Sequence, residues 1–109
     1  MDETLLVLTN LPDRDAAVKL AEALVGRRLA ACVNVLAECT SIYRWKGAVE
    51  NAREVPLLIK SRSALYDELE AAINELHPYE LPEIIAVPVV RGLPEYLAWV
   101  GEGTSISIG

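Results

Sequence analysis

The chain has one histidine, His77, and two cysteines, Cys32 and Cys39, so metal or nucleophilic chemistry has few side chains to draw on. A zinc or copper site needs three or four converging ligands. His77 is the natural first ligand, and Glu80 and Glu83 in the segment that follows it supply carboxylate oxygens. Two alternatives stay open. A histidine in a last helical turn interacts with free carbonyls and the helix dipole, and the carboxylates are solvated or paired with basic side chains.

The two cysteines differ in their surroundings along the sequence. Cys32 lies between apolar neighbours, where a free cysteine acts as a small core residue. Cys39 follows a break in the apolar alternation, so we consider it the more accessible thiol. On one straight strand the two would stand ~23 Å apart, too far for a disulfide. The metal-ligand hypothesis therefore names His77, Cys39 and Glu80, with copper or another divalent cation as the ion.

Sequence patterns that mark enzymes are absent from the chain. It contains no GxxxxGK[ST], GxGxxG, HExxH, GxSxG or CxxC motif. The only histidine base, His77, has no serine or cysteine close to it in the sequence. We therefore expect a protein that is not an enzyme.

Charge and hydropathy exclude two further classes of partner. The net charge is −6, and the ten Lys and Arg residues are scattered instead of clustered, which argues against nucleic-acid binding. No apolar run approaches the ~20 residues that a membrane span needs. The acidic start at Met1–Glu3 differs from the basic start of a signal peptide. We expect a cytoplasmic protein without membrane contact.

The apolar spacing predicts four strands and three helices. Strands are predicted at 5–9, 30–43, 48–61 and 84–90, and helices at 13–25, 63–77 and from Pro94 to about residue 100. We predict that Asp13 and Ser63 cap the first two helices, that the second strand bends near residues 38–39, and that Pro56 marks a bulge. Residues 101–109 are predicted to form a tail of low order, although Ile106 and Ile108 alternate as in a short strand.

Two strand–helix–strand units joined by a hairpin predict an α+β, ferredoxin-like βαββαβ sandwich with a long central hairpin, within one domain over residues 1–109. Both main helices would cover one face of the sheet and leave the other bare. The 14 predicted residues of the second strand would span ~46 Å, whereas the first helix spans ~20 Å. The overhanging hairpin carries Ile42, Tyr43, Trp45 and Val49, and exposed apolar side chains on such a ribbon favour association. A hairpin that folds back over its own sheet is the alternative.

Five blocks of sequence, in order, resemble the CutA family, which is named for tolerance to divalent cations. They are LAACVN at 29–34, SIYRWKG at 41–47, LLIK at 57–60, HPYELPEI at 77–84 and EYLAW at 95–99. The resemblance extends from residue 5 to about residue 100. It implies a ferredoxin-like subunit in a homotrimer, related in fold and assembly to the PII signalling proteins, and mostly cytoplasmic in microbes.

The resemblance also implies functions and ligand positions. Members are linked to tolerance of copper and other metal ions, and some animal members to the anchoring of a membrane enzyme. The metal site proposed for some members has a cysteine and two histidines at positions that read Thr9, Leu76 and His77 here. We therefore weigh two functions: a trimer that binds copper or another divalent ion, and a PII-like regulatory or scaffolding trimer that binds a small effector or a protein partner.

Overall fold

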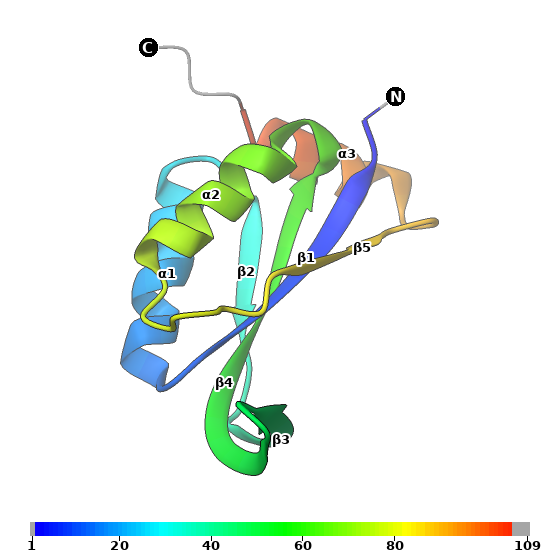
Figure 1. Ribbon diagram of the computed structural model, residues 1–109. Coiled ribbons are helices and arrows are strands. Elements are labelled where there is room, and N and C mark those ends of the chain that lie inside the picture. The colour runs from blue at the N-terminus through cyan, green and yellow to red at the C-terminus, as the bar shows by residue number, and fades with distance from the viewer. Residues whose placement is uncertain (1, 106–109) are drawn as a thin grey trace.

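The computed structural model describes residues 2–105 and has an α+β architecture (Figure 1). Its elements are β1 (Thr4–Leu11), α1 (Arg14–Gly26), β2 (Cys32–Val35), β3 (Cys39–Trp45), β4 (Ala48–Arg62), the 3-10 helix η1 (Ser63–Leu65), α2 (Tyr66–Leu76), β5 (Ile85–Pro88) and α3 (Pro94–Glu102). All strand pairs are antiparallel, in the order β2-β4-β1-β5, and β3 pairs with the first half of β4. Within these residues no helix combines the length and apolarity of a membrane span.

The strand predicted at 30–43 is interrupted, as expected, just before Cys39. Val35 pairs with Leu57, whereas Cys39 pairs with Glu54. Three residues, 36–38, therefore face only two on β4. One extra residue on one strand is the definition of a β-bulge, which bends the ribbon. The predicted bend is confirmed, and it separates β2 from β3.

The bulge predicted at Pro56 is wrong, because β4 continues through this residue. Pro56 pairs with Asn10 in an unbroken register with β1. Its carbonyl accepts a hydrogen bond from the Leu36 N–H. The N–H and C=O of a strand residue point to the same side, so the donor that proline lacks would face the interruption at 36–38. The bulge is thus on the neighbouring strand, at residues 36–38.

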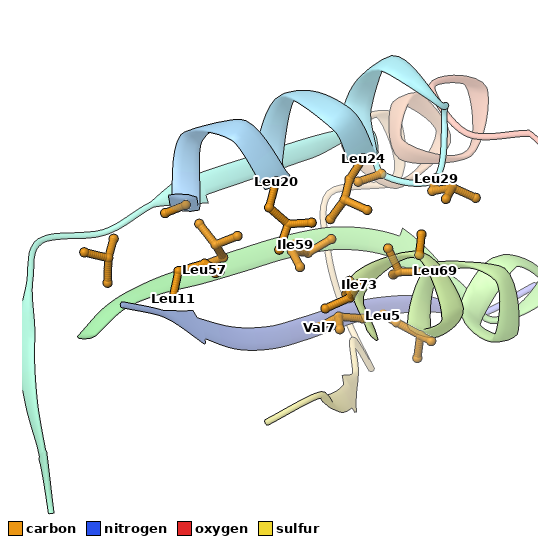
Figure 2. Close-up of a cluster of buried hydrophobic side chains, with 14 residues drawn as sticks. Leu5, Val7, Leu11, Leu20, Leu24, Leu29, Leu57, Ile59, Leu69 and Ile73 are labelled. Atoms are coloured by element: carbon orange, nitrogen blue, oxygen red, sulfur yellow. The ribbon is translucent and has the colours of Figure 1, made fainter. Parts of the chain in front are cut away.

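Both main helices cover one face of the sheet, as predicted. Along β1 the burial alternates, and Leu5, Val7, Thr9 and Leu11 face inward. Side chains from both helices and two strands form this core: Val7, Leu57 and Ile59 meet Leu20 and Leu24 of α1 and Leu69 and Ile73 of α2 (Figure 2). The helical spacing of apolar residues therefore identifies the buried side of both helices.

The N-terminal caps differ between the two helices. Asp13 caps α1 as predicted, since its carboxylate accepts the Ala16 N–H at 2.8 Å. Ser63 does not cap the second helix; its hydroxyl donates to the carbonyl of Glu3 at 3.3 Å. The Asp2 carboxylate accepts the Ala64 N–H at 2.9 Å, within the 3-10 helix η1 that precedes α2. A residue distant in the sequence thus binds a free N–H of this turn, and α2 itself has no side-chain cap.

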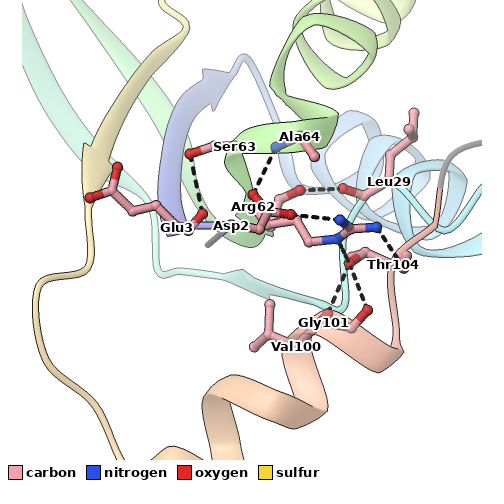
Figure 3. Close-up of polar contacts among 10 residues, drawn as sticks. Asp2, Glu3, Leu29, Arg62, Ser63, Ala64, Val100, Gly101 and Thr104 are labelled. Atoms are coloured by element: carbon pink, nitrogen blue, oxygen red, sulfur yellow. Dashed lines mark hydrogen bonds and ion pairs between the residues drawn. The ribbon is translucent and has the colours of Figure 1, made fainter.

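The second face of the sheet is covered at one end by α3, which packs against β4 and β1. Arg62, at the end of β4, donates to the Thr104 hydroxyl at 2.8 Å and to the Asp2 carboxylate at 2.6 Å (Figure 3). Thr104 in turn donates to the Val100 carbonyl at 2.9 Å. Low order was predicted from residue 101 onward, but Gly101 and Glu102 belong to α3, and Thr104 is held by this network. Ile106 and Ile108 lie outside the described residues.

The paired strands β3 and β4 project beyond the helices as an arm, defined here as residues 39–54 (Figure 1). Lys46 and Gly47 close it with φ angles of 49° and 84°, and two positive angles are typical of a type I′ hairpin turn. The arm leaves apolar surface bare, because Ile42 is 74% exposed and Val49 is 66% exposed. These exposed apolar side chains agree with the prediction that the long hairpin extends beyond the helices of its own subunit (Figure 1).

Candidate functional site

His77 follows α2 directly and is buried, with 7% of its surface exposed. Its Nε2 lies 2.7 Å from the Asn10 carbonyl oxygen, and its Nδ1 accepts the Tyr79 N–H at 3.1 Å. This arrangement requires the tautomer with the proton on Nε2. Burial lowers the pKa of His77, although the bond to Asn10 and the charge of Glu54 act in the opposite direction. At neutral pH the imidazole is therefore uncharged, and both of its nitrogens take part in hydrogen bonds.

The structure does not gather the other predicted metal ligands around His77. Cys39 begins β3 as a free, half-buried thiol 3.8 Å from the Ser41 hydroxyl. Glu80 is exposed in the loop after α2. Among residues 2–105 no group of three His, Cys, Asp or Glu side chains lies close enough to hold a metal ion. Within the described residues of a single chain, His77, Cys39 and Glu80 therefore do not form a common metal site.

The positions at which the resemblance expects metal ligands do not fit a metal in this chain. Thr9 is fully buried, and its Oγ1 has no hydrogen-bond partner in the described structure. Leu76 has no donor atom. The third position, His77, uses both ring nitrogens as described above. A hydroxyl, an aliphatic group and an occupied imidazole do not make the soft, nitrogen- and sulfur-rich site that copper prefers.

Glu54 is a functional candidate that the sequence analysis missed. It lies directly opposite Cys39 on β4, so the two side chains share one face of the arm. Only 9% of Glu54 is exposed. Burial raises the pKa of Tyr79, and the Glu54 carboxylate raises it further by hydrogen bonding and by charge. The Glu54 carboxylate thus lies close to the Tyr79 hydroxyl, and the negative charge of Glu54 also acts to raise the pKa of His77.

A cavity of about 930 Å³ opens between the arm and the loop after α2. Its polar and aromatic lining combines the arm, the end of β1 and the loop: Asn10, Ser41, Tyr43, Trp45, Glu54, Tyr79 and Glu83. The Asn10 side-chain amide donates to the Glu83 carboxylate at 3.2 Å, which ties the loop to β1. Concave sites with an apolar wall and a few polar groups are where small ligands bind.

A second polar cluster lies on the face of the sheet that α3 partly covers. Lys60 donates to the Asn34 side-chain oxygen, and its Nζ lies 4.0 Å from the Cys32 thiol. Burial raises the pKa of Tyr96 on α3, and the neighbouring Cys32 raises it further. Cys32 is half-buried here, not part of the closed core predicted for it. The cluster joins β2 and β4 to α3.

Fold and site together define a small α+β protein with an exposed hairpin arm and a cavity of about 930 Å³ beside it. The family model described as "CutA1 divalent ion tolerance protein" matches residues 5–103, and the chain belongs to this family. The resemblance seen in the sequence is confirmed.

Characterised relatives and solved structures agree with this membership. The divalent-cation tolerance protein CutA of Thermus thermophilus is 44% identical over 99 residues, covering 91% of this chain and 96% of its own length. Its structure superposes with a TM-score of 0.91, over 96% of this chain and all of the other. CutA1 of Oryza sativa gives 0.93 at 35% identity, over 96% of both chains. Protein CutA of Mus musculus is 46% identical over 93 residues, 85% of this chain, which spans about half (52%) of the mouse protein. The name of the Thermus thermophilus protein describes tolerance to divalent cations, and none of these names indicates a catalytic activity.

Proposed function

We propose that this chain functions in divalent-cation tolerance as a homotrimer of ferredoxin-like subunits. The observation that carries the proposal is the arm, whose Ile42 and Val49 are largely exposed. A two-stranded ribbon with bare apolar side chains gains free energy when another subunit covers it. The free thiols of Cys32 and Cys39 suit a reducing compartment, so a cytoplasmic location is part of the proposal.

The order of the strands supports the ferredoxin-like part. When β2 and β3 are taken as one strand bent at residues 36–38, the elements read βαββαβ, and the two crossover helices lie on one face. The third helix is then an addition at the C-terminal end of the subunit. Light scattering at decreasing protein concentration tests the assembly, with three chain masses expected and a monodisperse monomer contradicting it.

For the metal itself, we propose that copper or another divalent ion is coordinated between copies and not within one subunit. The support is the separation of Cys39, His77 and Glu80 within one chain, together with the occupied nitrogens of His77. Cys39 and Glu80 lie on the arm and its neighbouring loop, where a second copy is expected to dock. Calorimetric titration with Cu²⁺ and Zn²⁺ tests this. Cys39→Ser should weaken binding and His77→Ala should not, and the reverse result would restore a site centred on His77.

A second candidate function is a PII-like regulatory trimer that binds a small effector. The cavity between the arm and the loop after α2 favours it, because its volume suits an organic ligand. A thermal-shift screen with nucleotides, carboxylates and amines tests this function. A flat response to every class would argue against it.

A further inference from the structure

The two faces of the arm carry opposite charge. Side chains alternate between the faces along each strand, and residues directly opposite each other on β3 and β4 share a face. One face, called here the acidic face, holds the odd-numbered residues 39–45 and the even-numbered residues 48–54, with Glu50 and Glu54 as its charged groups. The other, the basic face, holds the even-numbered residues 40–44 and the odd-numbered residues 49–53, with Arg44 and Arg53. Each face therefore has charges of a single sign.

The cavity beside the arm lies on the acidic face. Every arm residue that lines it belongs to this face, with the exception of Ile42. Glu54 is buried at the cavity wall, and neither ion pair found among residues 2–105 involves it. No lysine or arginine is among the described residues that line the cavity. Because a buried charge without a counter-charge is costly, Glu54 is a carboxylate whose partner has to come from another chain.

The basic face offers the group that the cavity lacks. Arg44 is exposed and donates a long hydrogen bond, 3.5 Å, to the Gly47 carbonyl of its own turn. Val49 lies directly opposite Arg44, and Ile42 precedes it on the same face, so two largely exposed apolar side chains flank the guanidinium. Since Arg44 and Glu54 belong to opposite faces of one ribbon, a single chain cannot pair them.

A homotrimer needs two different surfaces that fit each other. Contact of one patch with the same patch on a second copy gives a two-fold dimer, whereas a closed ring of three requires head-to-tail contacts between two different patches. The basic face and the cavity are such a pair. The first presents a cation among apolar side chains, and the second presents a carboxylate among aromatic and apolar groups that include Leu81 and Ile85.

We propose that the basic face of each copy docks into the cavity of the next, where Arg44 pairs with Glu54 of the partner subunit. The inference rests on the proposed homotrimer and assigns its interface. Arginine meets a carboxylate through two parallel hydrogen bonds, and a pair shielded from water is stronger than an exposed one. An arm that fills the cavity also leaves no room there for a small effector, so this interface favours the first proposed function over the second.

Dissociation of the trimer tests the pairing, read by sedimentation at a urea concentration that partly dissociates the native protein. Arg44→Gln should raise the dissociation constant at least roughly tenfold, because it leaves a buried carboxylate without its counter-charge. Arg27→Gln removes an exposed arginine at the end of α1 and should change the constant by less than about threefold. Glu54→Gln should weaken the trimer as Arg44→Gln does. The double variant should be no weaker than the weaker single variant, because both changes remove the same pair.

Circular dichroism reports whether Glu54→Gln folds. If it does not, Arg44→Glu takes its place, since a carboxylate that faces Glu54 of the partner subunit should abolish the trimer, whereas Arg27→Glu should not. Equal dissociation of the Arg44→Gln and Arg27→Gln trimers would overturn this interface but leave the homotrimer intact. Single effects that multiply in the double variant would also overturn the pairing. A native chain that is monomeric before urea is added would contradict the proposed function itself.

Discussion

The imidazole Nε2 of His77 lies 2.7 Å from the carbonyl oxygen of Asn10, although the two residues are 67 positions apart. The bond joins the end of β1 to the loop that follows α2. Since the same loop lines the cavity, this contact positions Tyr79 and Glu83 as well as closing the core. His77 is thus a structural contact, and its titration has consequences for stability.

The burial of His77 predicts a loss of stability in mild acid. Its folded-state pKa lies below the ordinary value of 6.5, so the unfolded chain binds the proton more readily. The contribution of His77 is therefore complete above about pH 6.5 and declines as the pH falls through and below that value. Denaturant unfolding at a series of pH values measures it.

The same titration of His77→Gln, which keeps a side-chain donor, supplies the control. The decline between about pH 7 and pH 5 should be smaller than in the native protein. At neutral pH the variant should lose roughly 1 kcal/mol, the net value of one hydrogen bond. An identical pH dependence in both proteins would mean that His77 is not the group responsible.

Thr9 offers a stabilising substitution. Its Oγ1 is buried without a hydrogen-bond partner in the described structure, and an unpaired buried hydroxyl is unfavourable. Thr9→Val replaces it with a methyl group of similar size and should raise the free energy of unfolding by about 1 kcal/mol. Ser61→Ala is the contrasting variant, because the Ser61 hydroxyl donates to the Leu29 carbonyl at 2.7 Å. It should lose about 1–3 kcal/mol, and equal effects of the two changes would contradict this reasoning.

Arg62 joins the two ends of the described chain. Arg62→Ala removes the bonds to Asp2 and Thr104 and should lower the free energy of unfolding by about 2 kcal/mol. Arg53→Ala removes a more exposed ion pair with Glu38, 3.9 Å long, and should cost less than about 0.5 kcal/mol. Urea unfolding compares them, and amide exchange near residue 104 should rise only in the first variant.

The arm predicts which surface substitution disrupts assembly. Ile42→Lys places a charge on the exposed side of the arm and should convert the proposed trimer into smaller species. Val25→Lys changes a comparably apolar, exposed residue on α1 and should leave the mass unchanged. Light scattering reads the mass, and circular dichroism verifies that both variants fold. A trimer that persists in Ile42→Lys would exclude this part of the arm from the interface.

Much of the fold follows from signals that act over a few residues. Asp13 caps α1 because its carboxylate reaches an N–H three residues away, and Pro94 begins α3 because its fixed φ suits a first turn. The spacing of Leu69 and Ile73 identifies the buried face of α2. Each of these interactions is enclosed in one segment, so the order of residue types is sufficient to predict it.

The candidate site depends on contacts that no local pattern records. Asp2 caps the turn at Ala64, and Asn10 holds His77, only because the register of β1 on β4 brings these residues together. Glu54 carries no signal that singled it out in the sequence, yet it is buried at the wall of the cavity. Residue types and spacing therefore predict the elements and their faces. The partners of His77, the burial of Glu54 and the cavity between them arise from packing between distant segments, whose geometry is set only when the sheet is complete.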